Sequence, residues 1–340
     1  LAICLGGTQT TLAADTEKAA APLELGATEI SGQALGETTE GTQSYTTGEM
    51  ATATKLPLTM RETPQAVTVI TRQRMDDQAM TSVNDVVKNT PGLFLSQSSG
   101  PGRQTYSSRG FDIDNMMFDG LPSAYSGYAN SVQPNLAMFD RVEVIRGATG
   151  LVTGAGNPSA AINFVRKRPT ATPLHEVVLG TGSYDRKYGA FDFAGPIDDQ
   201  GEFLYRLTGL ASDANSSIDY ADTNRMLLAP SLTWLPNDRT SVTLFAQYQK
   251  DRDTPEAQGL PAEGTVFDSP NGKISRDLFI GEPGLNKYDR EQFVVGYDVA
   301  YELNDIWTLK QRTSYAYVDD QYVAPLHGYS YATNPNTGIN

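Results

Sequence analysis

The sequence predicts two structural parts in tandem, a small α+β domain followed by the antiparallel strands of a transmembrane β-barrel. Mixed helix and strand patterns between residues 61 and 170 predict the first part. Long strands with a period of two residues, from residue 174 onward, predict the second. Short turns alternate with long polar loops between these strands, which is typical of bacterial transmembrane barrels.

The α+β domain is predicted from short periodic segments and their boundaries. These segments are strands at 67–71, 141–145 and 161–165 and a helix at 72–80. Ser82, followed three positions later by Asp85, is typical of the N-terminus of a second helix, which Pro91 ends. The order of elements therefore favours a compact domain that mixes helices with a sheet.

The barrel strands are predicted from alternating side chains. The clearest cover 226–234, 242–249, 293–302 and 307–317. Short connections at 196–201, 235–239 and 303–306 alternate with longer polar stretches at 213–223 and 251–291. Trp234 and Trp307 lie beside short turns, where an interfacial aromatic girdle is expected. A soluble all-β sandwich would alternate equally well, but it explains the one-sided loop lengths and the aromatic positions less well.

Composition narrows the class of protein. Hydrophobic residues make up 39% and charged residues 19%, so the chain is too apolar to be disordered. The formal net charge of −14 argues against a nucleic-acid partner, because phosphate binding requires a basic surface. No run of 18 or more apolar residues is present, so no transmembrane helix is predicted.

The N-terminal region is predicted to be an export signal followed by a flexible segment. Residues 1–14 look like the remnant of a signal peptide, with small residues before Asp15 and the single cysteine, Cys4, inside it. Residues 15–60 are rich in Thr, Glu, Gly and Ala without sustained periodicity. Within them, 23–30 is a short patch of extended character.

The first domain is too large to be enclosed by the strands that this sequence contains. At most about seven strands fit between 174 and 340, too few to enclose a domain of this size, since barrels with a plugged lumen have about 22 strands. The sequence is therefore expected to be the N-terminal part of a longer chain, carrying about the first six or seven strands.

Several ordered motifs in the first domain carry a family resemblance. They are TPQAVTVITRQRM at 63–75, YSSRGF at 106–111, FDGLP at 118–122, DRVEVIRGATGLVTGAG at 140–156 and AINFVRKR at 161–168. Together they resemble the plug of TonB-dependent siderophore receptors, most closely the ferric-coprogen and ferric-pyoverdine receptors for hydroxamate-containing siderophores. GSYD at 182–185 adds support from the barrel portion.

The resemblance implies a plug at 61–170 inside a transmembrane antiparallel barrel that begins at 171. It implies energy-coupled uptake of a ferric siderophore across the bacterial outer membrane by a lipid-embedded monomer. The energy would come from TonB and its inner-membrane complex. The TonB box is expected near 23–30, as Leu25, Gly26, Ala27, Thr28, Glu29 and Ile30. Few residues separate this patch from the cleavage site, so no signalling domain is expected.

The resemblance also suggests site residues. Siderophore contacts are expected from Arg103, Gln104, Tyr106, Tyr125 and Tyr128. An arginine fork donates to carbonyl or hydroxamate oxygens, and tyrosine offers a large face with a polar tip. The alternatives are a solvated loop arginine and tyrosines packed on the barrel wall. Contacts that fix the plug in the barrel are expected from Arg109, Arg141, Glu143 and Arg146.

The sequence gives little support for nucleotide binding, metal binding or catalysis. The glycines of 147–156 fit neither the dinucleotide fingerprint nor the P-loop. His175 and His327 are far apart, so no metal-ligand set and no catalytic constellation is predicted. Neither enzyme activity nor a cofactor is expected, since the iron would arrive chelated by the siderophore. Alternatives are another cargo (cobalamin, heme or a glycan), a passive porin, or a soluble periplasmic enzyme or binding protein.

Overall fold

The structure is a computed structural model that describes residues 38–98, 104–123, 133–147, 150, 158–255 and 260–323. The chain divides into two compact units, Leu1–Ser31 and Gly32–Asn340. All described residues belong to the second unit.

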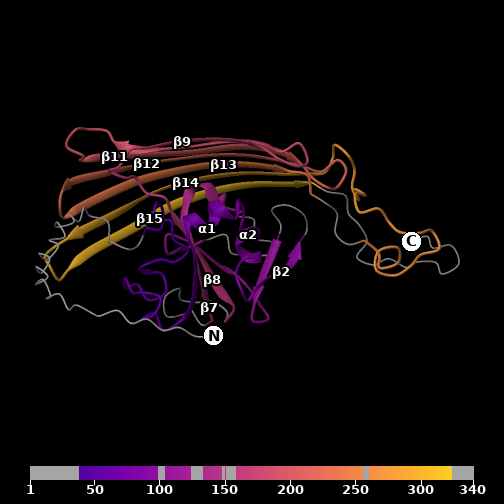
Figure 1. The fold of residues 1–340 in the computed structure, drawn as a ribbon, viewed down its shortest axis with the longest axis horizontal. Coiled ribbons are helices and arrows are strands. Elements are labelled where there is room, and N and C mark those ends of the chain that lie inside the picture. Colours follow the sequence, from indigo (N-terminus) through magenta and orange to yellow (C-terminus); the bar gives the residue numbers. More distant parts are fainter. Residues whose placement is uncertain are drawn as a thin grey trace, which may run out of the picture. The chain divides into compact units, whose positions relative to one another are not determined.

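The first domain contains two small sheets and short helices (Figure 1). The five-stranded sheet has the order β1 (Ala66–Ile70), β7 (Phe139–Arg146), β8 (Ala160–Arg166), β5 (Asn115–Phe118), β6 (Leu121–Pro122). The three-stranded sheet has the order β2 (Leu93–Ser98), β3 (Gln104–Ser108), β4 (Phe111–Asp112). The helices are α1 (Arg72–Asp77), α2 (Val83–Lys88) and the 3-10 helix η1 (Leu136–Met138). The predicted α+β domain is confirmed.

Local sequence explains where the two α-helices begin and end. Thr71 accepts a hydrogen bond from the Arg74 amide at 3.3 Å, and Ser82 and Asp85 form the predicted capping box. The first helix is shorter than the predicted 72–80, because Ala79 adopts a left-handed conformation with φ 48°. Among the described residues, no helix is long and apolar enough to cross a membrane.

The core of this domain is mostly aliphatic, includes a cluster of three phenylalanines, and continues into the strands that follow it. The rings of Phe118, Phe139 and Phe164 lie 5.4–6.0 Å apart between centroids. The same buried cluster includes Leu227, which belongs to a later strand. One hydrophobic core therefore joins the first domain to the second part of the chain.

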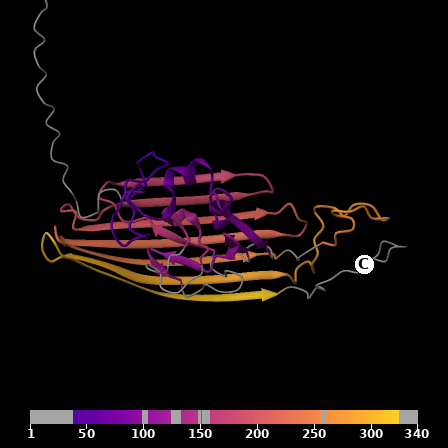
Figure 2. The same cartoon turned by 90° about the horizontal axis from the view of Figure 1, so that it is seen from below.

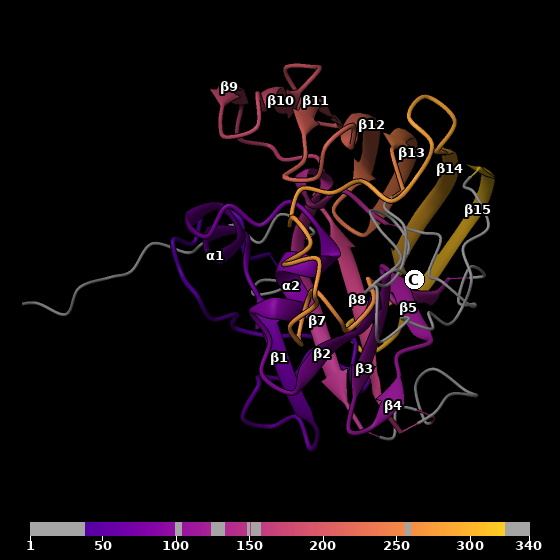
Figure 3. The same ribbon diagram turned by 90° about the vertical axis from the view of Figure 1, so that its right-hand side faces the viewer.

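The second part is a seven-stranded antiparallel sheet in which each strand pairs with the next along the chain (Figures 2 and 3). Its strands are β9 (Leu174–Thr181), β10 (Lys187–Pro196), β11 (Phe203–Asn215), β12 (Asp222–Asn237), β13 (Thr240–Asp253), β14 (Lys287–Glu302) and β15 (Thr308–Val323). In β12, Met226, Leu228 and Trp234 are exposed on one face. Leu227 and Thr233 are buried on the other. The predicted alternation is confirmed.

One predicted loop is shorter in the structure. The stretch 213–223 was expected to be a long connection, but β11 and β12 stay paired up to Asn215 and Asp222. The Ser216 amide then donates to the Ala221 carbonyl at 2.8 Å and closes the turn. Polar composition did not interrupt pairing here, because strand ends that extend beyond the apolar band keep their backbone hydrogen bonds in a polar setting.

Candidate functional site

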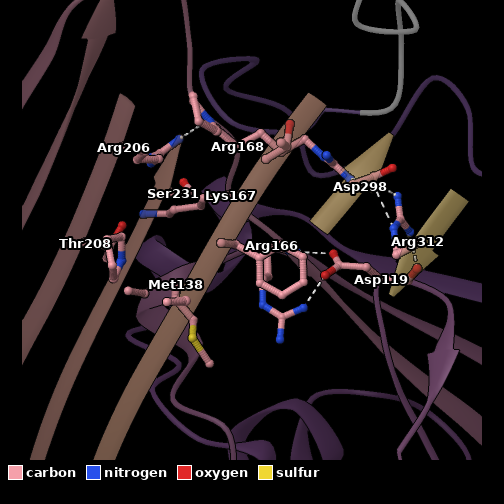
Figure 4. A pocket seen from close by; sticks show the side chains of 16 residues that line it. Asp119, Met138, Arg166, Lys167, Arg168, Arg206, Thr208, Ser231, Asp298 and Arg312 are labelled. Carbon is pink, nitrogen blue, oxygen red and sulfur yellow. Dashed lines mark hydrogen bonds and ion pairs between the residues drawn. The ribbon is translucent and has the colours of Figure 1, made fainter. Parts of the chain in front are cut away.

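We call the domain of β1–β8 with its helices the plug, and the sheet β9–β15 the wall. Three consecutive basic residues at the end of β8 bind the plug to the wall (Figure 4). Lys167 Nζ lies 2.7 Å from Asp192 Oδ2 on β10, and Arg168 Nη2 lies 2.7 Å from Asp298 Oδ2 on β14. Arg166 pairs with Asp119 of the plug itself. The ion pairs of the tripeptide therefore reach two wall strands that are separated by three others in the sheet.

Arg166 also stacks on an aromatic ring of the wall. Its guanidinium carbon lies 4.7 Å from the ring centroid of Phe245 on β13 and 5.6 Å from that of Phe118. Both distances are within the range of a cation–π contact. The ring of Phe245 lies against Gly296 on β14, where a Cβ would overlap it. A glycine on the wall thus makes room for the ring on which the plug arginine rests.

Asp119 is the acidic centre of this contact and belongs to a tight turn of the plug. Asp119 and Gly120 have φ values of 50° and 79°, as in a two-residue hairpin turn between β5 and β6. The Asp119 carboxylate accepts from the Arg166 amide at 2.9 Å, and Arg312 on β15 donates to the Asp119 carbonyl. Burial by itself would raise the pKa of Asp119, but Arg166, Arg312 and Arg168 outweigh it and hold that pKa below its ordinary value.

We expect the stabilisation by Asp119 to have a defined pH dependence. Because its pKa is lowered in the folded state, the contribution is present above the ordinary aspartate pKa of about 3.9 and is lost as the pH falls through the lower folded value. At pH 7, the free energy of unfolding of the full-length Asp119→Asn variant should be about 3 kcal/mol lower than that of the wild type. That difference should persist at pH 5 and shrink below pH 4, as measured by urea unfolding in detergent.

The matched control for this prediction is Asp114→Asn, which changes an exposed carboxyl in the same region of the plug. It should leave the free energy of unfolding within about 0.5 kcal/mol of the wild type at every pH. A difference between wild type and Asp119→Asn that stayed constant down to pH 3 would contradict the assigned pairing.

A second cluster is centred on Arg206 of β11, whose side chain is only 1% exposed. Its Nε lies 2.9 Å from Asp192 Oδ1, and its Nη2 lies 2.6 Å from Asp192 Oδ2. The other side of the guanidinium binds Glu40, with distances of 2.6 Å and 2.5 Å to the two carboxylate oxygens. Arg206 also donates to the Arg168 carbonyl at 3.0 Å. Arg206 therefore binds a carboxylate of the wall, a carboxylate of the segment before β1, and a backbone carbonyl of the plug.

The cavity between the two clusters is small. It has a volume of about 30 Å³, which is room for about one water molecule. Its lining includes Thr243 and Phe245. It also includes Met138, Lys167 and Ser231, which are labelled in Figure 4. Because the space is far too small for a chelated iron, we interpret this region as the contact that holds the plug and not as the ligand pocket.

The predicted siderophore contacts fall partly outside the described residues. Arg103, Tyr125 and Tyr128 lie outside them, as does the predicted TonB box at 25–30. Gln104 and Tyr106 are described and are both buried on the inner face of β3. Tyr106 is 0% exposed, belongs to the plug core, and donates from its hydroxyl to Asn84 Oδ1 at 2.8 Å. The expected ligand contact of Tyr106 is therefore corrected to a structural role, because strand alternation turns its ring inward.

If Tyr106 has a structural role, its substitution should lower the stability of the protein and leave its affinity for the siderophore nearly unchanged. Tyr106→Phe removes the hydroxyl and leaves Asn84 without this donor, which should cost about 1–2 kcal/mol of unfolding free energy. The ferric-siderophore dissociation constant of the full-length protein should change less than twofold. Urea unfolding and ligand-quenched fluorescence test the two statements separately, and a large loss of affinity at wild-type stability would restore the ligand-contact hypothesis.

The residues predicted to join plug and barrel have different partners in the structure. Arg141 Nε lies 2.6 Å from Glu143 Oε1, and Arg141 Nη1 lies 2.9 Å from Asp140 Oδ2. Arg146 donates to the Pro91 carbonyl at 2.9 Å, and Arg109 lies beside Gly147. These partners all belong to the plug. Arg141 and Glu143 are two residues apart on β7 and share a face, so their side chains lie next to each other.

Sequence reasoning missed the residues that do join the two parts. A usable signal was present, because Asp192, Arg206 and Asp298 each stand between two apolar or aromatic neighbours in the sequence of a wall strand. A charge at such a position faces the interior of a transmembrane barrel and requires a partner there. The run of three basic residues at 166–168, directly before the first wall strand, was the corresponding signal on the plug.

Comparison with known proteins agrees with this arrangement. Residues 59–161 match the family described as TonB-dependent Receptor Plug Domain. The ferripyoverdine receptor of Pseudomonas aeruginosa is 40% identical over 267 residues, which cover 77% of this chain and 32% of that protein. The ferrioxamine B receptor of Salmonella typhimurium is 35% identical over 270 residues, which cover 77% of this chain and 38% of the relative.

A solved structure extends the match to three dimensions. The pyoverdine outer-membrane receptor from Pseudomonas aeruginosa bound to pyoverdine superposes with a TM-score of 0.80 at 34% identity, covering 88% of this chain and 44% of that one. The chain thus spans about a third to two fifths of the length of the curated relatives it matches. The matched region includes both plug and wall strands, so the resemblance inferred from the motifs is confirmed. This chain belongs to the TonB-dependent receptors of the bacterial outer membrane.

Proposed function

We propose that the full-length protein binds a ferric siderophore at the cell surface and transports it into the periplasm with energy supplied through TonB. The observation that carries this proposal is a plug held against the polar face of the wall by a few ion pairs, which can separate, in addition to apolar packing. Support for the cargo comes from relatives named as ferric-pyoverdine, ferrioxamine and ferrichrome receptors. On this basis we propose a hydroxamate-containing siderophore.

Such a contact suits a plug that must move and return. If water enters the interface as the plug moves, it can solvate the separated charges, whereas it cannot replace apolar packing. Lys167 and Arg168 pair with side chains on wall strands, and Arg206 pairs with Asp192 within the wall, so the wall keeps its own hydrogen bonds when the plug shifts. Transport then needs a rearrangement of charge pairs and no covalent chemistry on the cargo.

The remaining parts of the mechanism are proposals that follow from the family. The segment at 25–30 would pair with an edge strand of TonB by main-chain hydrogen bonds, and TonB would connect it to the inner-membrane energising complex. Arg103, Tyr125 and Tyr128 would contact the siderophore from the plug. The iron would stay inside the siderophore, so neither a resident cofactor nor an enzyme activity is required. The limits of 61–170 for the plug and 171 onward for the barrel remain predictions.

Growth under iron limitation tests the proposal. A strain without this gene, supplied with ferrioxamine B, ferrichrome or pyoverdine as the only iron source, should fail to grow on at least one of them. The full-length gene should restore growth and uptake of radioactive iron only when TonB is present. Arg103→Ala should raise the siderophore dissociation constant at least tenfold, since a charged hydrogen bond contributes about 1.5–3 kcal/mol.

Three outcomes would contradict the proposed function. Uptake that continues without TonB would indicate a passive pore. Saturable binding of cobalamin, heme or a glycan, with no binding of the ferric siderophores, would change the cargo. Recovery of the full-length protein in the soluble fraction without detergent would exclude a membrane receptor of either kind.

A further inference from the structure

The wall carries a groove on its outward face, across the neighbouring strands β9, β10, β11 and β12 (Figure 3). The groove has a volume of about 640 Å³ and is lined by three consecutive residues of each strand, 179–181, 187–189, 211–213 and 224–226. Leu179 and Met226 are 82% and 48% exposed, whereas Leu227, on the opposite face, is buried in the plug core. The groove therefore lies on the side of the sheet that points away from the plug.

The two long sides of the groove differ in polarity. The apolar side is a row aligned by the strand register, Leu179, Gly189, Ala211 and Met226. The polar side is the row two positions nearer to the strand ends, Thr181, Lys187, Asp213 and Asn224. Residues two positions apart on a strand share a face, so both rows point outward and the backbone between them forms the floor. The groove thus follows a boundary between apolar and charged surface.

The hollow exists because the middle of the apolar row has almost no side chain. Gly189 has none and Ala211 has only a methyl group. A Cβ on Gly189 would come within 3.2 Å of Leu179, so the Leu179 side chain borders the hollow on the β9 side. Further from the strand ends, the ring of Phe191 lies over Gly209 and closes the groove there. The enclosed volume is within the range of small-ligand sites, about 300–1,000 Å³.

The strand ends beside the groove are those with the long connection. Residues 254–286 join β13 to β14 at this end, whereas the short turns at 197–202 and 238–239 lie at the other end. In outer-membrane barrels the longer loops face the outside of the cell. Exposed apolar side chains, among them Val177 and Leu228, continue from the groove toward the middle of the strands. The groove therefore meets the outer leaflet at the level where acyl chains pass into head groups.

We propose that this groove binds one phosphorylated, acylated glycolipid of the outer leaflet, of the lipid A type. An acyl chain lies over Gly189 and Ala211, and a phosphate binds Lys187. Neighbouring strands are about 4.8 Å apart, so four strands extend the groove over about 14 Å at head-group level. That length suits an elongated sugar head group better than the single phosphate of a diacyl lipid. The site adds a lipid partner to the family assignment and is independent of the transported cargo.

Charge complementarity is the reason for the phosphate. Lys187 is exposed and has no ion-pair partner within the part of the chain that the structure describes. Its flexible stem can follow the apolar surface while the ammonium stays at head-group level, and an ammonium donates charge-assisted hydrogen bonds to phosphate. Thr181, opposite Lys187 on β9, adds a hydroxyl donor. Asp213 is the one carboxylate of the polar row, and it accepts from Asn224 Nδ2 at 3.4 Å, so the phosphate is placed on the β9 side.

Native mass spectrometry of the full-length protein in detergent tests the groove. The probes, added after delipidation, are purified lipid A, dephosphorylated lipid A and phosphatidylglycerol. The wild type should bind one lipid A more tightly than either other lipid. Lys187→Gln should weaken the binding of lipid A at least fivefold and leave that of the dephosphorylated form unchanged. Ala211→Leu fills the groove with an apolar side chain and should weaken the binding of both forms.

The control variant is Lys287→Gln, which removes a cation at the same end of β14, outside the groove. It should leave the affinity for lipid A within twofold of the wild type. Urea unfolding without added lipid should be unchanged in Lys187→Gln and Ala211→Leu, because both positions are exposed on the outward face. A weaker binding of lipid A in these two variants then reports on the groove and not on a general loss of structure.

Three results would overturn this site. The first is equal affinity of the wild type, Lys187→Gln and Ala211→Leu for lipid A. The second is an equal loss of affinity in Lys187→Gln and Lys287→Gln, which would show unspecific attraction by the charged rim. The third is tighter binding of phosphatidylglycerol than of lipid A, which excludes the glycolipid. None of these measurements uses a siderophore or TonB, so they leave the proposed transport function untouched.

Discussion

Replacing Arg206 with methionine is expected to destabilise the full-length protein by about 3–5 kcal/mol, because it removes the cation that Asp192 and Glu40 share. Asp192 keeps Lys167 at 2.7 Å, but Glu40 keeps only a contact with Lys167 at 4.0 Å. Buried Asp192 and partly exposed Glu40 lose their main donor at once. The loss should appear as a lower urea midpoint in detergent and as a smaller fraction of heat-modifiable, folded protein in the outer membrane.

A matched substitution distinguishes this effect from the loss of an arginine in general. Arg239 lies in the exposed turn between β12 and β13. Arg239→Met should change the unfolding free energy by no more than about 0.5 kcal/mol. If both variants unfold at the wild-type urea concentration, the Arg206 cluster does not stabilise the contact between plug and wall.

Replacing Gly296 with alanine is the second change with a large expected effect. A Cβ at this position would overlap the ring of Phe245 on β13 and the backbone oxygen of Thr313 on β15. The ring cannot move toward the plug without displacing Arg166, which lies 4.7 Å from its centroid. We expect a cost of about 3 kcal/mol or more, at the upper end for added volume in a packed interior.

The measurement for Gly296→Ala is the yield of folded protein in the outer membrane together with its urea midpoint. Gly189→Ala is the control, since a Cβ there meets only the flexible end of Leu179, at 3.2 Å. Both substitutions replace glycine by alanine in a wall strand, so the change in β-strand propensity is the same for both. Equal stability of the two variants would show that the stack of Gly296, Phe245 and Arg166 does not matter for assembly.

The sequence by itself determined those strands and helices whose contacts lie within a few residues along the chain. Alternation with a period of two predicts the wall strands because each residue's face follows from the one before it. The capping box at Ser82 and Asp85 predicts the second helix for the same reason, since its contacts span one turn. The motifs at 63–75 and 140–156 lie within the plug and were enough to suggest the family.

Only the tertiary structure decided which charges meet and which way Tyr106 points. Arg168 and Asp298 are 130 residues apart, and Glu40 and Arg206 are 166 apart, so no local pattern could pair them. Strands β7 and β8 are buried on both faces for most of their length, so alternation within the plug does not say which face meets the wall. Which plug residue meets which wall residue is decided by packing across the whole interface, because the two parts that pack together are distant in the chain.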